Sequence, residues 1–557
     1  MVHNKDDRRA GFPRPVVSHL TLNLIVAAYI FAALNLGFWS RMVAAFHGNP
    51  VQIGLFGIAI FGLTLFTLEL LGPARLQRPA AAALILIASG ASYYERTFGV
   101  LIDREMIRNV FETTVTESRH LITFGAVAQI GLSGILPAAL VFWPRVRRVR
   151  RWHHLWRWPM GMGLSLAILL GGLFSEYKAF SAVLRERKEV MAAYQPGATI
   201  AALVKFGKEQ FAGGDPVARP IALDAAPGPH LAAATKPVLL VFFAGETARA
   251  QNFGLNGYER DTTPGLAARD VINFPDVSSC GTSTAVSLPC MFSIYKRSEY
   301  SDSKGESTES VLDVLAHAGI GTAWWDTNTG SKGVAARTVE ISLAAADDPR
   351  FCAEGECRDD ILVDKLKQEL PKVTGNTVFV LHTIGSHGPA YFMRYTEDEA
   401  PFKPDCRSAD FADCTNDEIR NAYDNTIAYT DKILGEVIDA LDGEGDRINA
   451  SMIYMSDHGE SLGENGLYLH GAPYFMAPDE QTHVPFIMWL SQPFVDEEGI
   501  DTDCLKANAE AGGFSHDNLF HTILGSIEID TETYDPKLDV LAACRTHDAD
   551  GDGAMRS

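Results

Sequence analysis

The stretch Val238-Leu-Leu-Val-Phe-Phe-Ala244, followed directly by Gly245-Glu246-Thr247, decides the fold of the C-terminal part of the chain. An apolar run without polar alternation is typical of a strand that is buried on both faces of a parallel sheet. A carboxylate stands where the strand should end. Ligands of such sheets bind beyond the carboxyl ends of the strands. The stretch therefore predicts a central strand with a functional carboxylate at its end.

Further apolar runs follow, and helical stretches separate them. The expected strands are 237–244, 320–325, 377–382, 451–456 and 484–490, and the expected helices include 284–294, 309–318 and 416–441. Short strands that alternate with helices indicate an α/β fold with a largely parallel sheet, covered by helices on both faces. We expect this architecture for the region after residue 236.

Side chains with metal-binding chemistry follow three of these strands. They are Glu246 after the first strand, Asp457 and His458 after 451–456, and His382 and His387 after Leu381. Oxygen ligands combined with imidazole suit zinc or manganese, and the nitrogen favours zinc. His470 lies in a loop rich in glycine and aromatics and is a further candidate for the same cleft. Taken alone, each residue has another interpretation: Glu246 as a helix cap and His470 as a surface histidine.

The segment Cys280-Gly-Thr-Ser-Thr284 supplies hydroxyl groups next to an expected helix N-terminus. Unpaired backbone N–H groups and the helix dipole favour a bound phosphate at such a position. A threonine hydroxyl is a weak nucleophile that a metal ion activates. Thr284 is therefore the candidate nucleophile, and a Ser/Thr-rich helix cap is the alternative interpretation of the segment.

The N-terminal third of the chain differs from the rest in charge and hydropathy. Residues 1–175 carry a net charge of +9 and the remainder −30, within a formal net charge of −21 for 557 residues. Five apolar stretches predict membrane-spanning helices, at roughly 20–39, 51–71, 79–94, 121–143 and 158–175. The pattern indicates a membrane domain followed by an acidic soluble domain. The acidic charge argues against nucleic acid as a partner.

Basic clusters set the expected orientation in the membrane. With five spans, the clusters before the first span, at Arg75 and Arg78, and at 145–151 all fall on one side. The positive-inside rule places that side in the cytoplasm and everything after about residue 176 outside it. All eight cysteines lie in this outer part, which predicts disulfides. Local spacing favours Cys280–Cys290, Cys352–Cys357 and Cys406–Cys414, which leaves Cys504–Cys544 by elimination.

The outer loop between the third and fourth spans carries Asn109, Thr113 and Glu117, spaced i, i+4, i+8. On one helix these side chains would form a polar stripe, and a solvated face is its simplest interpretation. The expected domains are a five-helix transmembrane domain over 1–175, a helical linker over 176–235, a catalytic domain over 236–545 and a flexible acidic tail over 546–557.

A series of motifs along the chain resembles one family of enzymes. The motifs are Gly245-Glu-Thr-Ala-Arg-Ala-Gln-Asn-Phe-Gly-Leu-Asn-Gly-Tyr258, Cys280-Gly-Thr-Ser-Thr284, Ser331-Lys-Gly333, Gly385-Ser-His-Gly-Pro-Ala-Tyr391, Tyr423-Asp-Asn-Thr426, Ser456-Asp-His-Gly-Glu-Ser461 and Ser515-His-Asp-Asn518. In this order they resemble the phosphoethanolamine transferases, membrane enzymes that modify lipid A and include the mobile colistin-resistance proteins. The resemblance covers nearly the whole chain and implies an alkaline phosphatase/sulfatase-like catalytic domain.

The resemblance also implies roles for particular residues. It implies zinc, with a second ion left open, bound by Glu246, Thr284, Asp457 and His458, and Thr284 as the nucleophile. The implied substrate-binding residues are Asn109, Thr113, Glu117, Asn328, Thr329, Lys332, His387 and His470. The last two also match histidines that bind a second zinc or assist the leaving group and acceptor, so we count them with Thr284 as catalytic. In this context the polar stripe of the outer loop is functional.

The expected reaction moves phosphoethanolamine from phosphatidylethanolamine to a phosphate of lipid A, through a covalent ester on Thr284. We expect a monomer in the bacterial inner membrane, with a periplasmic catalytic domain. Core heptose or a periplasmic glucan as acceptor, and glycerol-phosphate transfer, are the alternatives. A sulfatase would need Cys/Ser-x-Pro-x-Arg, whereas Ser287-Leu-Pro-Cys-Met291 lacks the arginine.

Overall fold

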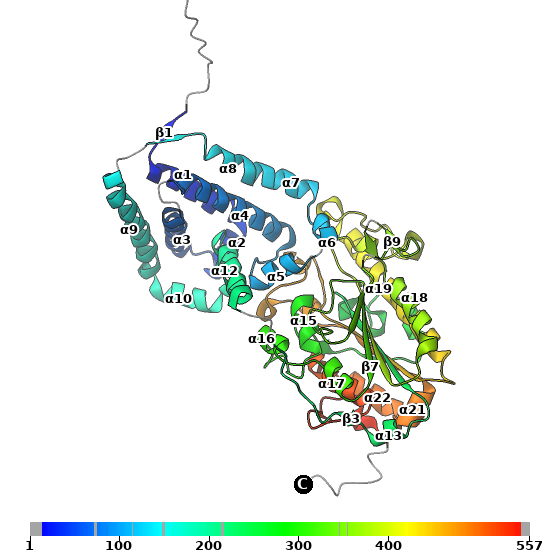
Figure 1. The fold of residues 1–557 in the computed structure, drawn as a ribbon. Helices are drawn as coiled ribbons and strands as arrows, with labels where there is room; N and C mark the ends of the chain where they lie inside the picture. The colour runs from blue at the N-terminus through cyan, green and yellow to red at the C-terminus, as the bar shows by residue number, and fades with distance from the viewer. Residues whose placement is uncertain are drawn as a thin grey trace, which may run out of the picture. The chain divides into compact units, whose positions relative to one another are not determined.

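The computed structural model describes residues 14–71, 75–113, 115–147, 151–212, 217–344, 346–353 and 355–546 (Figure 1). The chain forms two compact units. Unit 1 comprises residues up to 107 together with 124–208, and unit 2 comprises 108–123 and all residues from 209 onward. The outer loop 108–123 therefore belongs to the same unit as the predicted catalytic residues. Some residues used in the sequence predictions lie outside the described residues. They are Lys5, Arg8, Arg9, Arg148 and Arg150 of the basic clusters, and the tail after Thr546.

Unit 1 is helical. Its helices are α1 His19–Ala33, α2 Leu36–Ala45, α3 Pro50–Leu71, α4 Gln77–Phe98, α7 Phe124–Ile130, the π-helical turn η1 Gly131–Ile135, α8 Leu136–Leu140, α9 Arg151–Ser175, α10 Tyr177–Glu186, α11 Lys188–Ala192 and α12 Gly197–Ala212, whose last residues pass into unit 2. Helices α3 and α9 approach closely, because Gly62 lies against the backbone of Leu169 and Gly172 lies against Ala59. Small residues allow such close approach between membrane helices.

Two helices of the described residues are long and apolar enough to cross a membrane. They are α3 and the part of α9 from Trp156 to Ser175. The pair α1 and α2 makes a third span if the two count as one, and residues 124–140 form a shorter apolar segment. The predicted total of five spans therefore stays a prediction.

The first predicted span is not one helix. The expected helix over 20–39 breaks between Ala33 and Leu36, where α1 and α2 meet at 66°. Asn35 explains the break, because its side-chain amide donates to the carbonyls of Ile30 and Gln195 and accepts from the Gln195 N–H. A side chain that bonds to backbone groups in this way competes with the helix ladder.

The polar stripe of the outer loop is also not on one helix, so that expectation was wrong. Helix α5 spans Arg104–Glu112, and α6 spans Val115–His120. Thr113 ends α5, with its hydroxyl and its N–H both donating to the Asn109 carbonyl at 2.6 and 2.8 Å. Within unit 2, Arg108 lies 3.2 Å from Asp302 and His120 lies 3.8 Å from Glu356.

Unit 2 is built on a seven-stranded sheet, which confirms the predicted α/β fold. Its strand order is β5-β15-β12-β4-β11-β7-β8. The strands are β5 Ile272–Phe274, β15 Phe486–Leu490, β12 Asn449–Ser456, β4 Val238–Gly245, β11 Thr377–His382, β7 Gly321–Asp326 and β8 Val339–Ser342. The five strands from β12 to β8 run parallel. At one edge β15 pairs antiparallel with β12, and β5 pairs antiparallel with β15, so β5 runs in the same direction as the five. Each predicted strand coincides with an observed one.

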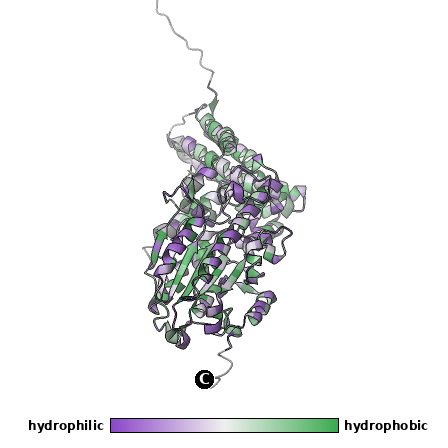
Figure 2. Cartoon of the chain, turned by 90° about the vertical axis from the view of Figure 1, so that its right-hand side faces the viewer, coloured by the Kyte–Doolittle hydropathy of each residue, from purple (hydrophilic) through white to green (hydrophobic). Residues whose placement is uncertain are grey.

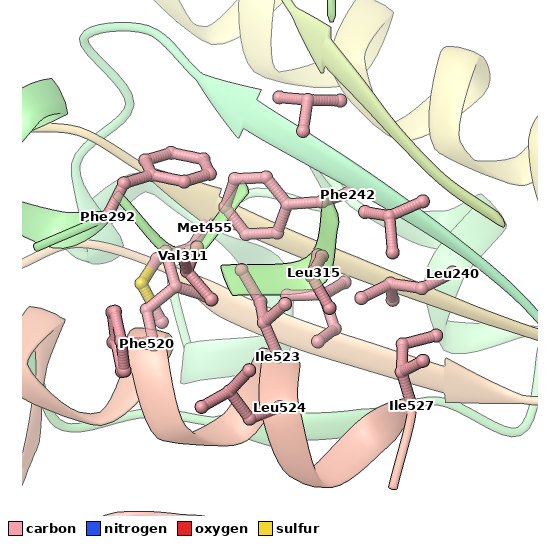
Figure 3. Packing of buried hydrophobic residues seen from close by; sticks show 14 of the residues in the cluster. Leu240, Phe242, Phe292, Val311, Leu315, Met455, Phe520, Ile523, Leu524 and Ile527 are labelled. Atoms are coloured by element: carbon pink, nitrogen blue, oxygen red, sulfur yellow. The ribbon is translucent and has the colours of Figure 1, made fainter. Parts of the chain in front are cut away.

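Helices cover both faces of this sheet (Figure 1). They include α15 Thr284–Met291, α17 Val311–His317, α18 Asp360–Glu369, α19 Asn416–Asp442, α21 Gln492–Glu498, α22 Thr502–Ala511 and α23 Leu519–Ser526. Leu240 and Phe242 of β4 pack with Leu315 of α17 and Ile523 of α23 on one face (Figure 3). All residues of β4 are buried. Figure 2 accordingly shows the central strands as mostly hydrophobic.

The structure confirms all four predicted disulfides. They are Cys280–Cys290, Cys352–Cys357, Cys406–Cys414 and Cys504–Cys544. Each lies in unit 2, and each except the last closes a short loop. The first of them encloses Thr284.

Candidate active site

Neighbouring parallel strands bring the predicted ligands together. Ser456, the last residue of β12, pairs in register with Gly245 of β4, so Glu246 and Asp457 leave the sheet side by side. Thr247 then adopts a left-handed backbone conformation at φ 59°, and its N–H donates to Asp457 Oδ1 at 3.2 Å. This turn fixes the two carboxylates relative to one another.

Glu246, Asp457 and His458 form a fully buried cluster whose ligand atoms lie within 4.8 Å of one another. His458 Nε2 is 3.3 Å from Glu246 Oε1 and 3.5 Å from Asp457 Oδ2. The Thr284 hydroxyl donates to both Glu246 oxygens, at 3.0 and 3.1 Å, and lies 3.4 Å from His458 Nε2. Zinc–ligand bonds of 2.0–2.1 Å in a tetrahedron space the ligand atoms about 3.3 Å apart. The four side chains therefore have the spacing of a zinc site.

The free lone pairs of the cluster also suit a cation. Asp457 Oδ1 accepts from backbone N–H groups, whereas its buried Oδ2 has no hydrogen-bond partner among the described residues. His458 Nδ1 faces the Gly459 carbonyl at 2.9 Å, which makes Nδ1 the protonated nitrogen. Nε2 then presents its lone pair toward Glu246 and Asp457. A fixed tautomer of this kind is typical of metal-binding histidines.

The electrostatics of the cluster also favour a bound cation. Burial raises the pKa of Asp457 to about 6, and repulsion from Glu246 adds to this effect. Burial alone would lower the pKa of His458, but Asp457 and Glu246 raise it to about 10. Two buried carboxylates thus attract positive charge, and a divalent ion supplies it more completely than one imidazolium.

Several contacts hold the loop that leads to Thr284, here called the nucleophile loop and comprising 280–284, and three of them come from different segments. Its first residue is joined to Cys290 by the disulfide. Buried His516 accepts the Cys280 N–H at Nδ1 and donates from Nε2 to the Ser456 carbonyl, at 3.0 and 2.9 Å. The Gly471 N–H donates to the Thr282 carbonyl at 2.7 Å. The loop that leads to Thr284 is therefore tied to the end of β12, directly before Asp457, and to the loop that carries His470.

A second buried acid–base pair supports Glu246 from the other side. Asp326 ends β7 and lies 2.6 Å from Nδ1 of His382, the last residue of β11. Asn328 donates to Glu246 Oε2 at 2.7 Å and lies 3.3 Å from His382 Nε2. Burial alone would lower the pKa of His382, but Asp326 and Glu246 raise it to about 10. Asn328 was predicted as a substrate ligand, and in the structure it contacts Glu246.

His387 and His470 flank the cluster. The ring of His470 lies 4.5 Å from that of His458 and 5.3 Å from that of His387. His470 Nδ1 faces Glu460 Oε2 at 2.8 Å, and the other Glu460 oxygen accepts from the Tyr391 hydroxyl. Burial lowers the pKa of His470, with Glu460 opposing the shift. His470 therefore lies beside His458, and His387 lies beside His470.

The remaining predicted residues lie elsewhere in unit 2. Thr329 and Lys332 are on the turn after β7, where Lys332 has a left-handed backbone at φ 51°. Asn109 and Thr113 lie at the end of α5. Glu117 belongs to α6, but its side chain lies outside the described residues.

Sequence reasoning missed the supporting residues Asp326, Glu460 and His516. Asp326 could have been found, because it too stands at the carboxyl end of a parallel strand. His516 was noticed only as part of a motif, since nothing local shows that its two nitrogens bridge separate backbones.

Comparison with known proteins identifies the family. A family model described as "Phosphoethanolamine transferase EptA/EptB" matches residues 60–211, and one described as "Sulfatase" matches 239–529. Phosphoethanolamine transferase EptA of Escherichia coli K12 is 37% identical over 542 residues, which cover 96% of this chain and 98% of that protein. The chain belongs to the phosphoethanolamine transferase family.

Two further members are similar over most of the chain. Phosphatidylethanolamine transferase Mcr-1 of Escherichia coli is 34% identical and covers 86% of this chain and 91% of its own length. The structure of integral membrane protein lipooligosaccharide phosphoethanolamine transferase A from Neisseria meningitidis aligns with a TM-score of 0.91 at 36% identity, over 95% of this chain and 99% of that one. In the present chain, Thr284 lies within the region that matches the sulfatase model. Cys290, which lies in the segment Ser287–Met291 compared with the sulfatase motif above, forms a disulfide with Cys280.

Proposed function

We propose that this membrane enzyme transfers phosphoethanolamine from phosphatidylethanolamine to a phosphate of lipid A, with Thr284 as the nucleophile. The observation that carries the proposal is the Thr284 hydroxyl, 3.0 Å from Glu246 and 3.4 Å from His458, inside a buried cluster with the spacing of a zinc site. The Neisseria relative is named for lipooligosaccharide, and a relative from Escherichia coli K12 is named Kdo(2)-lipid A phosphoethanolamine 7''-transferase. These names support the acceptor. One chain supplies the complete cluster, which supports a monomer.

In the first step the Thr284 oxygen attacks the phosphorus of the donor. The bond between Thr284 Oγ1 and phosphorus forms, the bond from phosphorus to the diacylglycerol oxygen breaks, and that oxygen takes up a proton. A divalent ion held by Glu246, Asp457 and His458 would lower the pKa of the threonine hydroxyl and offset charge on the phosphate oxygens. Glu246 orients the hydroxyl, and Asn328 holds Glu246 in place.

In the second step a phosphate oxygen of the acceptor attacks the phosphoethanolamine–threonine ester. A bond forms between this acceptor oxygen and the phosphorus, the bond from phosphorus to Thr284 Oγ1 breaks, and Thr284 Oγ1 takes up a proton from the acceptor phosphate. His470 is suited to carry protons in both steps, because burial lowers its pKa and keeps it neutral near pH 7, while Glu460 fixes one ring nitrogen. His387 is its neighbour and the second candidate.

The outer loop fits the binding of the donor head group. Residues 108–123 belong to unit 2, and Arg108 and His120 contact Asp302 and Glu356 of the same unit. We assign Asn109, Thr113 and Glu117 to this head group, together with Thr329 and Lys332. A carboxylate such as Glu117 would pair with the ethanolamine ammonium.

The apolar helices of unit 1 would hold this site at the outer surface of the inner membrane. Both substrates are lipids, so their head groups are available only there, and anchoring raises the effective concentration of the site near them. The four disulfides support a periplasmic location of unit 2, because such bonds persist in oxidising compartments.

The test uses the full-length protein purified in detergent and incubated with phosphatidylethanolamine. Mass spectrometry of the peptide that contains Thr284 should show a phosphoethanolamine adduct in the wild type and in Thr284→Ser, and none in Thr284→Ala. In a polymyxin-sensitive Gram-negative host, the wild type should add one phosphoethanolamine unit to extracted lipid A. Modified lipid A from cells with Thr284→Ala would reject the role of Thr284.

A further inference from the structure

Arg297 lies beside the nucleophile loop and is held there by defined contacts. Its side-chain Nε donates to the Cys280 carbonyl at 3.1 Å. Its guanidinium carbon lies 3.2 Å from the centre of the Tyr474 ring. Its backbone N–H donates to Asp517 at 2.7 Å. The cation is therefore fixed although the residue is exposed.

Tyr474 connects Arg297 to the loop that carries His470. Tyr474 begins the turn η9 Tyr474–Met476, four residues after His470. Its hydroxyl donates to the Ser279 carbonyl at 3.0 Å, next to the nucleophile loop. Gly471 of the same loop is bonded to Thr282. Arg297 thus sits where the segments bearing the nucleophile and His470 meet.

The Arg297 guanidinium contacts the Tyr474 ring and the Cys280 carbonyl, but neither partner carries a negative charge. Among the residues that the structure describes, no carboxylate oxygen forms an ion pair with this guanidinium, whereas Arg337 pairs with Asp313 and Arg545 with Glu498. With Nε bonded to Cys280, the two terminal nitrogens remain as donors. An unpaired, positioned guanidinium in a strongly acidic part of the chain is suited to an anionic ligand.

The proposed reaction needs such a group. Two phosphates must approach each other in the second step, one esterified to Thr284 and one on the acceptor. A divalent ion held by Glu246, Asp457 and His458 would offset charge on the first. We propose that Arg297 binds the attacking phosphate of the acceptor through its two terminal nitrogens, while the Tyr474 ring packs against the guanidinium plane. The inference rests on the proposed function and assigns the acceptor subsite within it.

Measuring the two steps of the reaction separately distinguishes binding of the acceptor by Arg297 from support of the nucleophile loop. The full-length protein in detergent is mixed with phosphatidylethanolamine alone, and the release of diacylglycerol in the first turnover is measured. Transfer is then measured against increasing concentrations of bis-phosphorylated lipid A. Arg297→Gln is the test variant, because glutamine keeps a donor for the Cys280 carbonyl without the charge. Arg350→Ala, which removes an exposed arginine paired with Asp348, is the matched control.

Arg297→Gln should leave the diacylglycerol burst unchanged and raise the KM for lipid A about 10-fold, the loss expected for a charge-assisted phosphate contact. Arg350→Ala should match the wild type in both measurements. An unchanged KM in Arg297→Gln would overturn the inference. A burst that falls together with transfer would also overturn it, because Arg297 would then only support the nucleophile loop. A wild type without a burst would instead refute the proposed covalent mechanism, and the subsite with it.

Discussion

His516 should make unit 2 sensitive to acid, and this effect can be calculated from its contacts. The side chain is buried, and its two nitrogens satisfy the Cys280 N–H and the Ser456 carbonyl. Burial lowers its pKa to about 4, and the bond to the Ser456 carbonyl only partly opposes the shift. A second proton would have to sit on Nδ1, directly against the Cys280 N–H. The folded protein therefore resists protonation here.

The sign and the size of the effect follow from the two pKa values. In the unfolded chain a histidine has a pKa of about 6.5, so between about pH 6.5 and pH 4 the unfolded chain binds more protons. Stability is then lost as the pH falls through this window. Lowering the pH from 7 to 5 should cost about 2 kcal/mol through His516 alone. Glutamine does not titrate, so His516→Gln should lack this contribution.

The assay is urea unfolding of the full-length protein in detergent, at pH 7 and pH 5 with the same zinc concentration. Pulse proteolysis reads the unfolding of unit 2. The wild type should lose about 2 kcal/mol more than His516→Gln between the two pH values. Burial also lowers the pKa of His521 to about 4, but His521 titrates in both proteins and cancels in the difference. Equal losses in the two proteins would refute the reasoning.

Three further predictions concern the site. Asp457→Asn should abolish tight zinc binding, measured as zinc per protein after dialysis. The exposed control Asp446→Asn should keep its zinc, and retained zinc in Asp457→Asn would exclude this carboxylate as a ligand. Asp326→Asn should reduce kcat about 10-fold, because His382 loses the charge that orients it against Glu246; an unchanged kcat would make the pair purely structural. Replacing Cys280 and Cys290 together by serine should cost about 3 kcal/mol of stability in the same urea assay, and no loss would show that the loop is held by its other contacts.

The strands and the Glu246–Asp457–His458 cluster could be predicted because they depend on local patterns and one topological rule. Val238–Gly245 is apolar throughout, and only a strand between two other strands, covered on both faces, buries all of its residues. The carboxyl ends of parallel strands meet at one edge. Glu246 and Asp457 therefore had to converge, although more than 200 residues separate them.

Other features could not be predicted, because they depend on contacts between distant segments. Asn35 breaks the first predicted span by bonding to Gln195, which no local pattern reveals. The i, i+4 spacing of the outer loop suggested one helix, but α5 ends at Glu112 and α6 begins at Val115. His516 bridges two backbones that are remote from it in sequence.

The contacts around Thr284 show why so many residues outside the cluster matter. The nucleophile loop is joined to α15 by a disulfide, to β12 through His516 and to the His470 loop through Gly471. Because the three contacts come from different segments, Thr284 can move relative to His458 only if several of them break together. A displacement of about 1 Å at a reacting oxygen can cost about 100-fold in rate. Substitutions at these supporting positions should therefore lower kcat while leaving the KM for both lipids unchanged, whereas loss of Arg297 should act on the acceptor KM.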